Sequence, residues 1–133
     1  MQWRNPRRGR QEGAATVEAA ISLSVLLLLI LGIVEFGVAL YNWNTMQLAI
    51  QQAGRFVMIN NASCNAGCAE TQMQNVLTTA AVCTTPTAGQ ICVNATTTAG
   101  TPQTMTLTAA YRFNFIALTG PFTMASQATF PLD

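Results

Sequence analysis

The stretch RRGRQEGAATVEAAISLSVLLLLILG, residues 7–32, joins a basic segment to a long apolar run and decides the architecture of the chain. The run extends from Ala19 to Tyr41, and Glu35 is its only charged residue. As an α-helix, 23 residues measure roughly 35 Å, enough to cross a bilayer core of about 30 Å. A backbone in lipid must satisfy its own hydrogen bonds, so a single transmembrane helix is predicted here.

The basic residues predict the orientation of this helix. Four of the six lie in the first ten positions, namely Arg4, Arg7, Arg8 and Arg10. Because such flanks stay in the cytoplasm, residues 1–13 are interpreted as a basic cytoplasmic leader, which sends the C-terminal part outside. A basic tail can also bind nucleic acid. Beside an apolar run, however, it is far more typical of a topogenic signal, and no nucleic acid partner is expected.

A secretory signal peptide is the competing interpretation of the same stretch. Gly37-Val38-Ala39 resembles a small-residue cleavage site, and cleavage there would release a protein that starts at Leu40. The apolar stretch is longer than the usual signal core of about 7–15 residues. Helix-compatible sequence also continues beyond the site. An uncut anchor is therefore favoured at that end.

The helical pattern continues past the apolar run. In NWNTMQLAIQQAGRFVMI, residues 42–59, apolar side chains recur at helical spacing of three and four: Met46, Ala49, Ile50, Ala53 and Val57. One helix is therefore predicted over residues 14–60, the transmembrane and extended segment. Asn60, Asn61 and Gly67 are expected to end it.

Residues 61–133 are predicted to form a small extracytoplasmic domain. A short amphipathic helix is expected around residues 70–81. Runs 90–97, 105–115 and 122–130 alternate apolar and polar side chains between Gly and Pro breaks, as in strands with one buried face. The expected fold class is α+β, pilin-like: a long N-terminal transmembrane helix extending into a small, disulfide-stapled antiparallel β-sheet domain.

The four cysteines, Cys64, Cys68, Cys83 and Cys92, all lie in this outer part. An even number in a small exported domain indicates two disulfides, for which three connectivities exist. The pairs 64–68 and 83–92 are favoured because they would tie down the loops on either side of the second helix. The spacing lacks the CxxC pairs of zinc sites and the chain has no histidine, so no metal or other cofactor is expected.

Glu18, at the edge of the apolar run, is the least expected residue. One interpretation places Glu18 at the headgroup level in the first helical turn, where the helix dipole favours an acid. Charged and buried in lipid without a partner, its side chain would cost a few kcal/mol. If the chain were cut between Gly13 and Ala14, the new α-amine of one subunit could neutralise Glu18 of its neighbour. That pairing would fix the axial stagger between subunits.

Residues 13–42, GAATVEAAISLSVLLLLILGIVEFGVALYN, carry the motifs of a known family. They resemble the TadE-like family, the minor pseudopilins of the tight-adherence (Flp) type IV pilus. That family typically has a basic leader, a glycine, a Val-Glu-Phe-Ala element, a leucine-rich run and a Gly-Ile-x-Glu-Phe-Gly element. The matching positions are Gly13, Val17, Glu18 and Ala20 in the first part, and Gly32, Ile33, Glu35, Phe36 and Gly37 in the second.

The resemblance implies a structural subunit of the pilus or its assembly machinery. A prepilin peptidase would cut the chain between Gly13 and Ala14, and Glu18 is the third residue of this processing site. The chain would remain in the bacterial inner membrane with its C-terminal domain in the periplasm. Implied partners are other pilin or pseudopilin subunits, the inner-membrane assembly platform and membrane lipid. Glu18, Gly32, Glu35 and Gly37 are the expected helix-assembly residues. For Glu35, a snorkelling interfacial position is the other interpretation.

No pattern indicates an enzyme, because the chain has no histidine and no Gly-rich phosphate loop. An uncut, single-pass periplasmic binding protein and a secreted protein released near Ala39 remain the alternatives. The N-terminal residue of the isolated protein distinguishes the three hypotheses: Ala14, Met1 or Leu40.

Overall fold

The computed structural model describes residues 8–60, 62–115 and 120–132, and their side chains from Gly13 onward. Arg4, Arg7 and Asn61 therefore lie outside the described residues. The chain divides into two compact units, Met1–Phe36 and Gly37–Asp133. The division falls inside one helix, so the second unit contains the C-terminal part of that helix together with the whole sheet.

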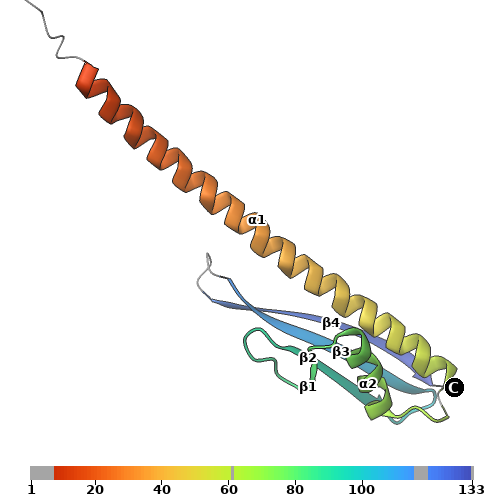
Figure 1. The fold of residues 1–133 in the computed structure, drawn as a ribbon. Coiled ribbons are helices and arrows are strands. Elements are labelled where there is room, and N and C mark those ends of the chain that lie inside the picture. The colour runs from red at the N-terminus through yellow and green to blue at the C-terminus, as the bar shows by residue number, and fades with distance from the viewer. Residues whose placement is uncertain (1–7, 61, 116–119, 133) are drawn as a thin grey trace, which may run out of the picture. The chain divides into compact units, whose positions relative to one another are not determined.

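Helix α1 runs from Arg8 to Ile59 (Figure 1). The predicted end of this helix is confirmed, because Asn60 caps the last turn by donating both its backbone N–H and its side-chain amide to the Phe56 carbonyl, each at 3.0 Å. The five apolar residues at helical spacing in the second unit are all buried, with at most 2% of their surface exposed: Met46, Ala49, Ile50, Ala53 and Val57. The periodicity therefore identified the face of α1 that builds the core.

Helix α2 spans Ala66–Val76, four to five residues earlier than predicted. Asn65 is its N-cap, and the Asn65 side chain accepts a hydrogen bond from the Cys68 N–H at 3.0 Å. This cap fixes the first turn, so Gly67 lies inside α2 and does not end α1, contrary to the prediction. Ala69 and Met73 are the buried residues of α2.

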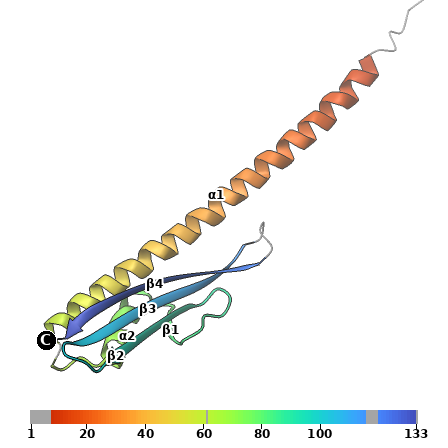
Figure 2. The ribbon, with the colours of Figure 1, turned by 180° about the vertical axis from the view of Figure 1, so that it is seen from behind.

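Four strands form one sheet in the order β1-β2-β3-β4, comprising β1 (Ala81–Val82), β2 (Ile91–Thr98), β3 (Gln103–Asn114) and β4 (Pro121–Leu132). The three long strands are antiparallel, as predicted. The two-residue β1 pairs with β2 in parallel, which makes the sheet mixed, and no sequence pattern had indicated it. Figures 1 and 2 show β3 and β4 running alongside α1 in both views.

The core lies between one face of the sheet and the two helices. Alternate residues of β3 fill it, with Met105, Leu107 and Ala109 fully buried, and Val93 of β2 joins them. The opposite face of β3 carries Thr and Arg side chains. The disulfides Cys64–Cys68 and Cys83–Cys92, with Cα–Cα distances of 5.3 and 5.1 Å, staple the α1–α2 connection and β1 to β2. The favoured connectivity is thus the one present.

Candidate assembly and processing site

The apolar segment of α1 leaves its side chains exposed all round the helix. Fifteen large apolar residues between Val17 and Leu40 are exposed, including every residue from Val25 to Leu31. At roughly 1.5–3 kcal/mol for each such side chain, covering them is worth more than the 5–15 kcal/mol that typically stabilises a whole domain. This surface is therefore built to be covered.

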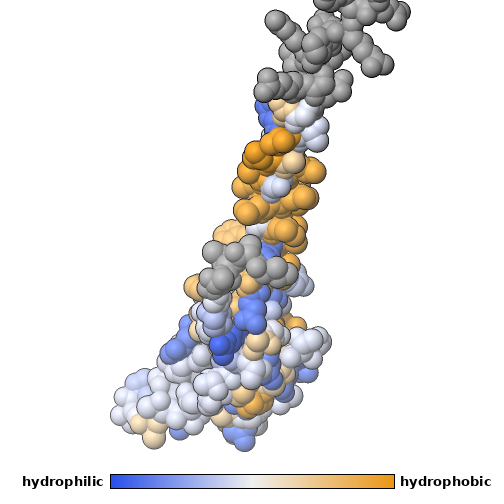
Figure 3. All heavy atoms as spheres, turned by 90° about the vertical axis from the view of Figure 1, so that its left-hand side faces the viewer, coloured by the Kyte–Doolittle hydropathy of each residue, from blue (hydrophilic) through white to orange (hydrophobic). Residues whose placement is uncertain are grey.

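Length and composition agree with a membrane as the covering medium. Residues Gly13–Ile59 form the single candidate span among the described residues, with a mean hydropathy of 2.6 in its most apolar window. Figure 3 shows hydrophobic residues gathered along the helix, whereas the unit with the sheet is mostly pale or hydrophilic. Ser24 lies within this segment, and its hydroxyl donates to the Ala20 carbonyl at 2.8 Å, which satisfies it without water.

Gly13, Ala14 and Glu18 all lie on α1 and are exposed. Ala14 and Glu18 are four residues apart, so they lie on one face about one turn from each other. A Cβ built at Gly13 would meet no atom within 4 Å. Packing inside the chain therefore gives no reason for a glycine there. A helical glycine costs up to about 1 kcal/mol relative to alanine, so it lowers the cost of local unwinding at this point.

The second predicted group, Gly32, Glu35 and Gly37, does not form one patch. Gly32 and Glu35 are three residues apart and share a face. At about 100° per residue, Gly37 lies roughly 160° around the helix from Glu35. A single neighbouring helix can therefore contact Gly32 and Glu35 together, or Gly37, but not all three. Gly32 and Gly37 also have open space where a Cβ would lie.

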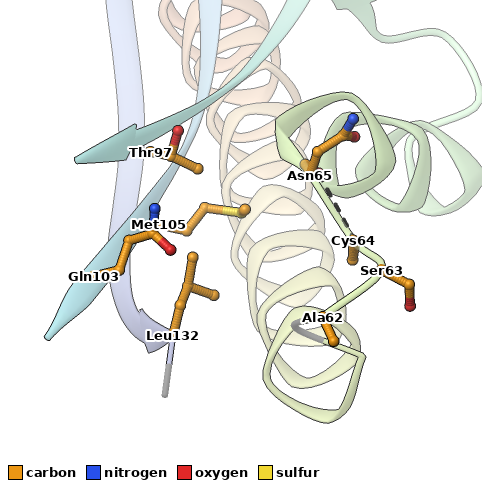
Figure 4. Close-up of a pocket in the computed structure, with 8 residues that line it drawn as sticks. All are labelled: Ala62, Ser63, Cys64, Asn65, Thr97, Gln103, Met105 and Leu132. Atoms are coloured by element: carbon orange, nitrogen blue, oxygen red, sulfur yellow. Dashed lines mark hydrogen bonds between the residues drawn. The ribbon is translucent and has the colours of Figure 1, made fainter. Parts of the chain in front are cut away.

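Just beyond the C-terminal end of α1, a cavity of about 330 Å³ opens beside the Cys64–Cys68 disulfide (Figure 4). Its walls come from the α1–α2 connection, the ends of β2 and β3, and the end of β4. They offer neutral hydrogen-bonding groups and apolar carbon, and no ionisable side chain is among them: Ala62, Ser63, Cys64, Asn65, Thr97, Gln103, Met105 and Leu132. This lining suits packing or a neutral ligand rather than acid–base chemistry.

Two contacts that hold the second unit together were not foreseen. The Ala95 N–H, on the side of β2 away from β3, donates to the Glu70 Oε1 at 3.0 Å. The Phe130 ring lies against α1 at Gly54, where it occupies the space of a Cβ. An isolated glycine inside a helical pattern, such as Gly54, can indicate that another part of the chain packs closely against the helix. Glu70 carried no comparable signal.

The family comparison agrees with the motifs of the N-terminal segment. Residues 13–55 match the family model described as TadE-like protein. No curated protein and no solved structure matches the chain. The TadE-like segment begins at Gly13, covers the apolar run of α1 and ends inside the part of α1 that builds the core.

Proposed function

We propose that this chain is a pseudopilin-like structural subunit of a tight-adherence (Flp) pilus or of its assembly machinery. The observation that carries the proposal is the coincidence of the TadE-like match, residues 13–55, with the helix whose apolar side chains are exposed. A family that assembles through an N-terminal helix requires such a helix, available to lipid and to neighbouring subunits. The partners are other pilin or pseudopilin subunits and the inner-membrane platform.

The orientation follows from the arginines before the helix. With residues 1–13 in the cytoplasm, α1 crosses the inner membrane and the disulfide-bonded sheet unit lies in the periplasm. Two disulfides fit that oxidising compartment. Release by cleavage after Ala39 is disfavoured, because Ala39 lies within α1 and is buried in the second unit.

Processing is proposed at the bond between Gly13 and Ala14, by a prepilin peptidase. Hydrolysis consumes one water and yields a carboxylate on Gly13 and an α-amine on Ala14. A peptidase binds an extended substrate, so the first turns of α1 must unwind, which the glycine favours. The new amine of one subunit then lies at the depth where the Glu18 carboxylate of a neighbour requires a cation.

The N-terminus of the isolated protein tests this proposal. The chain is extracted from membranes of cells with and without the peptidase, and its N-terminus and intact mass are determined. We expect Ala14 with the peptidase and Met1 without it. A chain that keeps its leader in the presence of an active peptidase would contradict processing, and a chain starting at Leu40 in the soluble fraction would contradict the anchor.

A further inference from the structure

Aromatic side chains gather where β3 ends and β4 begins, and Phe113, Phe115 and Phe122 are together called the aromatic tip. Phe113 and Phe115, near the end of β3, have ring centroids 4.7 Å apart, and Phe115 and Phe122 are 6.5 Å apart. Tyr111 extends the row with an edge-on contact to Phe113 at 5.6 Å. Phe122 is 55% exposed, and Phe122 and Val82 are the large apolar residues exposed among the described residues of the strands. The exposed Phe122 ring thus lies at the edge of a row of aromatic side chains that is otherwise buried or half-buried.

The level of the tip along α1 follows from the contacts within the second unit. Phe130 contacts Gly54, and its partner across the strands is Met105. The eight residues from Met105 to Phe113 advance about 26 Å at about 3.3 Å each. The same distance corresponds to roughly 17 residues of a helix at 1.5 Å each. Phe113 therefore lies near the beginning of the α1 segment in this unit.

Burial supports this level independently. Ala39 is 5% exposed, although Val38 and Leu40 on either side of it are exposed, so the second unit covers α1 at that turn. Phe113 is also buried, and both residues lie outside the main core cluster. Figures 1 and 2 show the hairpin running along α1 away from the C-terminal end of the helix. The aromatic tip is thus at the turn of α1 where the apolar run, which ends at Tyr41, is finishing.

We infer that this tip inserts into the headgroup region of the outer leaflet and gives the protein a second contact with the membrane. The inference depends on the proposed membrane anchoring. When α1 spans a bilayer with its apolar run, the level of Ala39 coincides with the lipid interface, where aromatic side chains are enriched. Arg112 alternates with Phe113 along β3 and thus projects from the opposite face, where a cation can bind lipid phosphate.

Depth-dependent fluorescence quenching tests this inference on the full chain in vesicles of phosphatidylethanolamine and phosphatidylglycerol. Trp3 and Trp43 are replaced by phenylalanine, and a single tryptophan is introduced as Phe122→Trp. Two sets of lipids serve as quenchers, one brominated near the carbonyl end of the acyl chains and one near the methyl end. Leu29→Trp in the apolar run is the positive control, and Thr98→Trp, exposed at the far end of the sheet, is the negative control.

We expect bromines near the carbonyl end to quench the tip tryptophan and bromines near the methyl end to quench Leu29→Trp, which lies near the middle of the apolar run. Neither set should quench Thr98→Trp. Arg112→Gln in the tip-tryptophan chain should reduce the quenching in phosphatidylglycerol-rich vesicles. Quenching of Leu29→Trp without quenching at the tip would overturn the inference while leaving the anchor intact. A chain that does not float with the vesicles would overturn the anchor itself, and the inference with it. The measurement is made at low protein density, where contacts between subunits are rare. A tip that is covered by a second subunit and not by lipid would therefore show no quenching, which is the negative result.

Discussion

The Phe130 ring fills the space beside Gly54 that a side chain on α1 would occupy. This contact sets the approach of β4 to the helix, and it predicts that Gly54→Ala destabilises the second unit. Overpacking costs ~1–3 kcal/mol, which exceeds the gain of up to ~1 kcal/mol from replacing a helical glycine. We expect a net loss of about 1 kcal/mol, measured by urea unfolding of the full chain in detergent with Trp43 fluorescence.

The double variant Gly54→Ala/Phe130→Leu is the matched control. With the ring gone, the added methyl group meets open space, so Gly54→Ala should be neutral or stabilising in the Phe130→Leu background. Additive effects of the two substitutions would show that the ring does not limit the approach of the helix.

Glu70 protects the side of β2 that faces away from β3. Its Oε1 accepts from the Ala95 N–H at 3.0 Å, and Ala95 is buried. Glu70→Ala leaves this amide without its acceptor, which costs about 1–3 kcal/mol. Glu70→Gln keeps an oxygen in place and should cost less. Hydrogen exchange at Ala95 is the direct measurement: Glu70→Ala should accelerate it, and equal protection in both variants would contradict the role assigned to Glu70.

The Cys83–Cys92 disulfide attaches β1, which has only two residues, to β2. Replacing both cysteines with serine should lower the free energy of unfolding by about 2–3 kcal/mol, because the crosslink closes a short loop in the unfolded chain. Cys64→Ser/Cys68→Ser closes a shorter loop and should cost less. A larger loss of unfolding free energy in Cys64→Ser/Cys68→Ser would contradict this order and show that the disulfide in the α1–α2 connection stabilises the chain more.

Local patterns predicted those parts of the structure that local forces decide. The burial of Met46, Ile50 and Val57 follows from the helical spacing of apolar residues, and the long strands follow from alternation. The start of α2 differs from the prediction because the capping hydrogen bond of Asn65 begins the helix before the amphipathic pattern of residues 70–81. Strand β1 has only two residues, too few to show the alternation of apolar and polar side chains that predicts a strand.

The contact of Phe130 with Gly54 joins residues far apart in the chain, so it emerges only when the sheet packs on α1. The level of the hairpin tip depends on that contact. The candidate assembly residues were readable one at a time. Their grouping can be read from the sequence as well, because the spacing on a predicted helix places Gly37 away from Gly32 and Glu35.

Helix packing in the assembly should distinguish Gly32 from Gly37. Each has open space at its Cβ position, so Gly32→Leu and Gly37→Leu should both leave the fold and membrane insertion intact. Because small residues allow close approach of helices, a leucine on the contact face should abolish assembly. We expect one of the two substitutions to reduce pilus formation strongly and the other to have little effect, as measured by pilus yield from cells. Equal effects of both would contradict a single contact face.

Glu18 gives the most direct test of how subunits join. Glu18→Gln keeps the size and exposure of the side chain but removes the charge that the Ala14 amine of a neighbour would pair with. An uncharged residue crosses into lipid more easily, so insertion should be unimpaired or improved. Assembly should fall, because each subunit would then bury an amine without its counter-charge, a loss of several kcal/mol for each interface. Flotation of the membrane fraction measures insertion, and pilus yield measures assembly. Glu18→Asp is the matched control, since it keeps the charge and should retain part of the assembly. If Glu18→Gln assembled as well as the parent chain, with its leader cleaved to the same extent, the pairing of amine and carboxylate would be wrong.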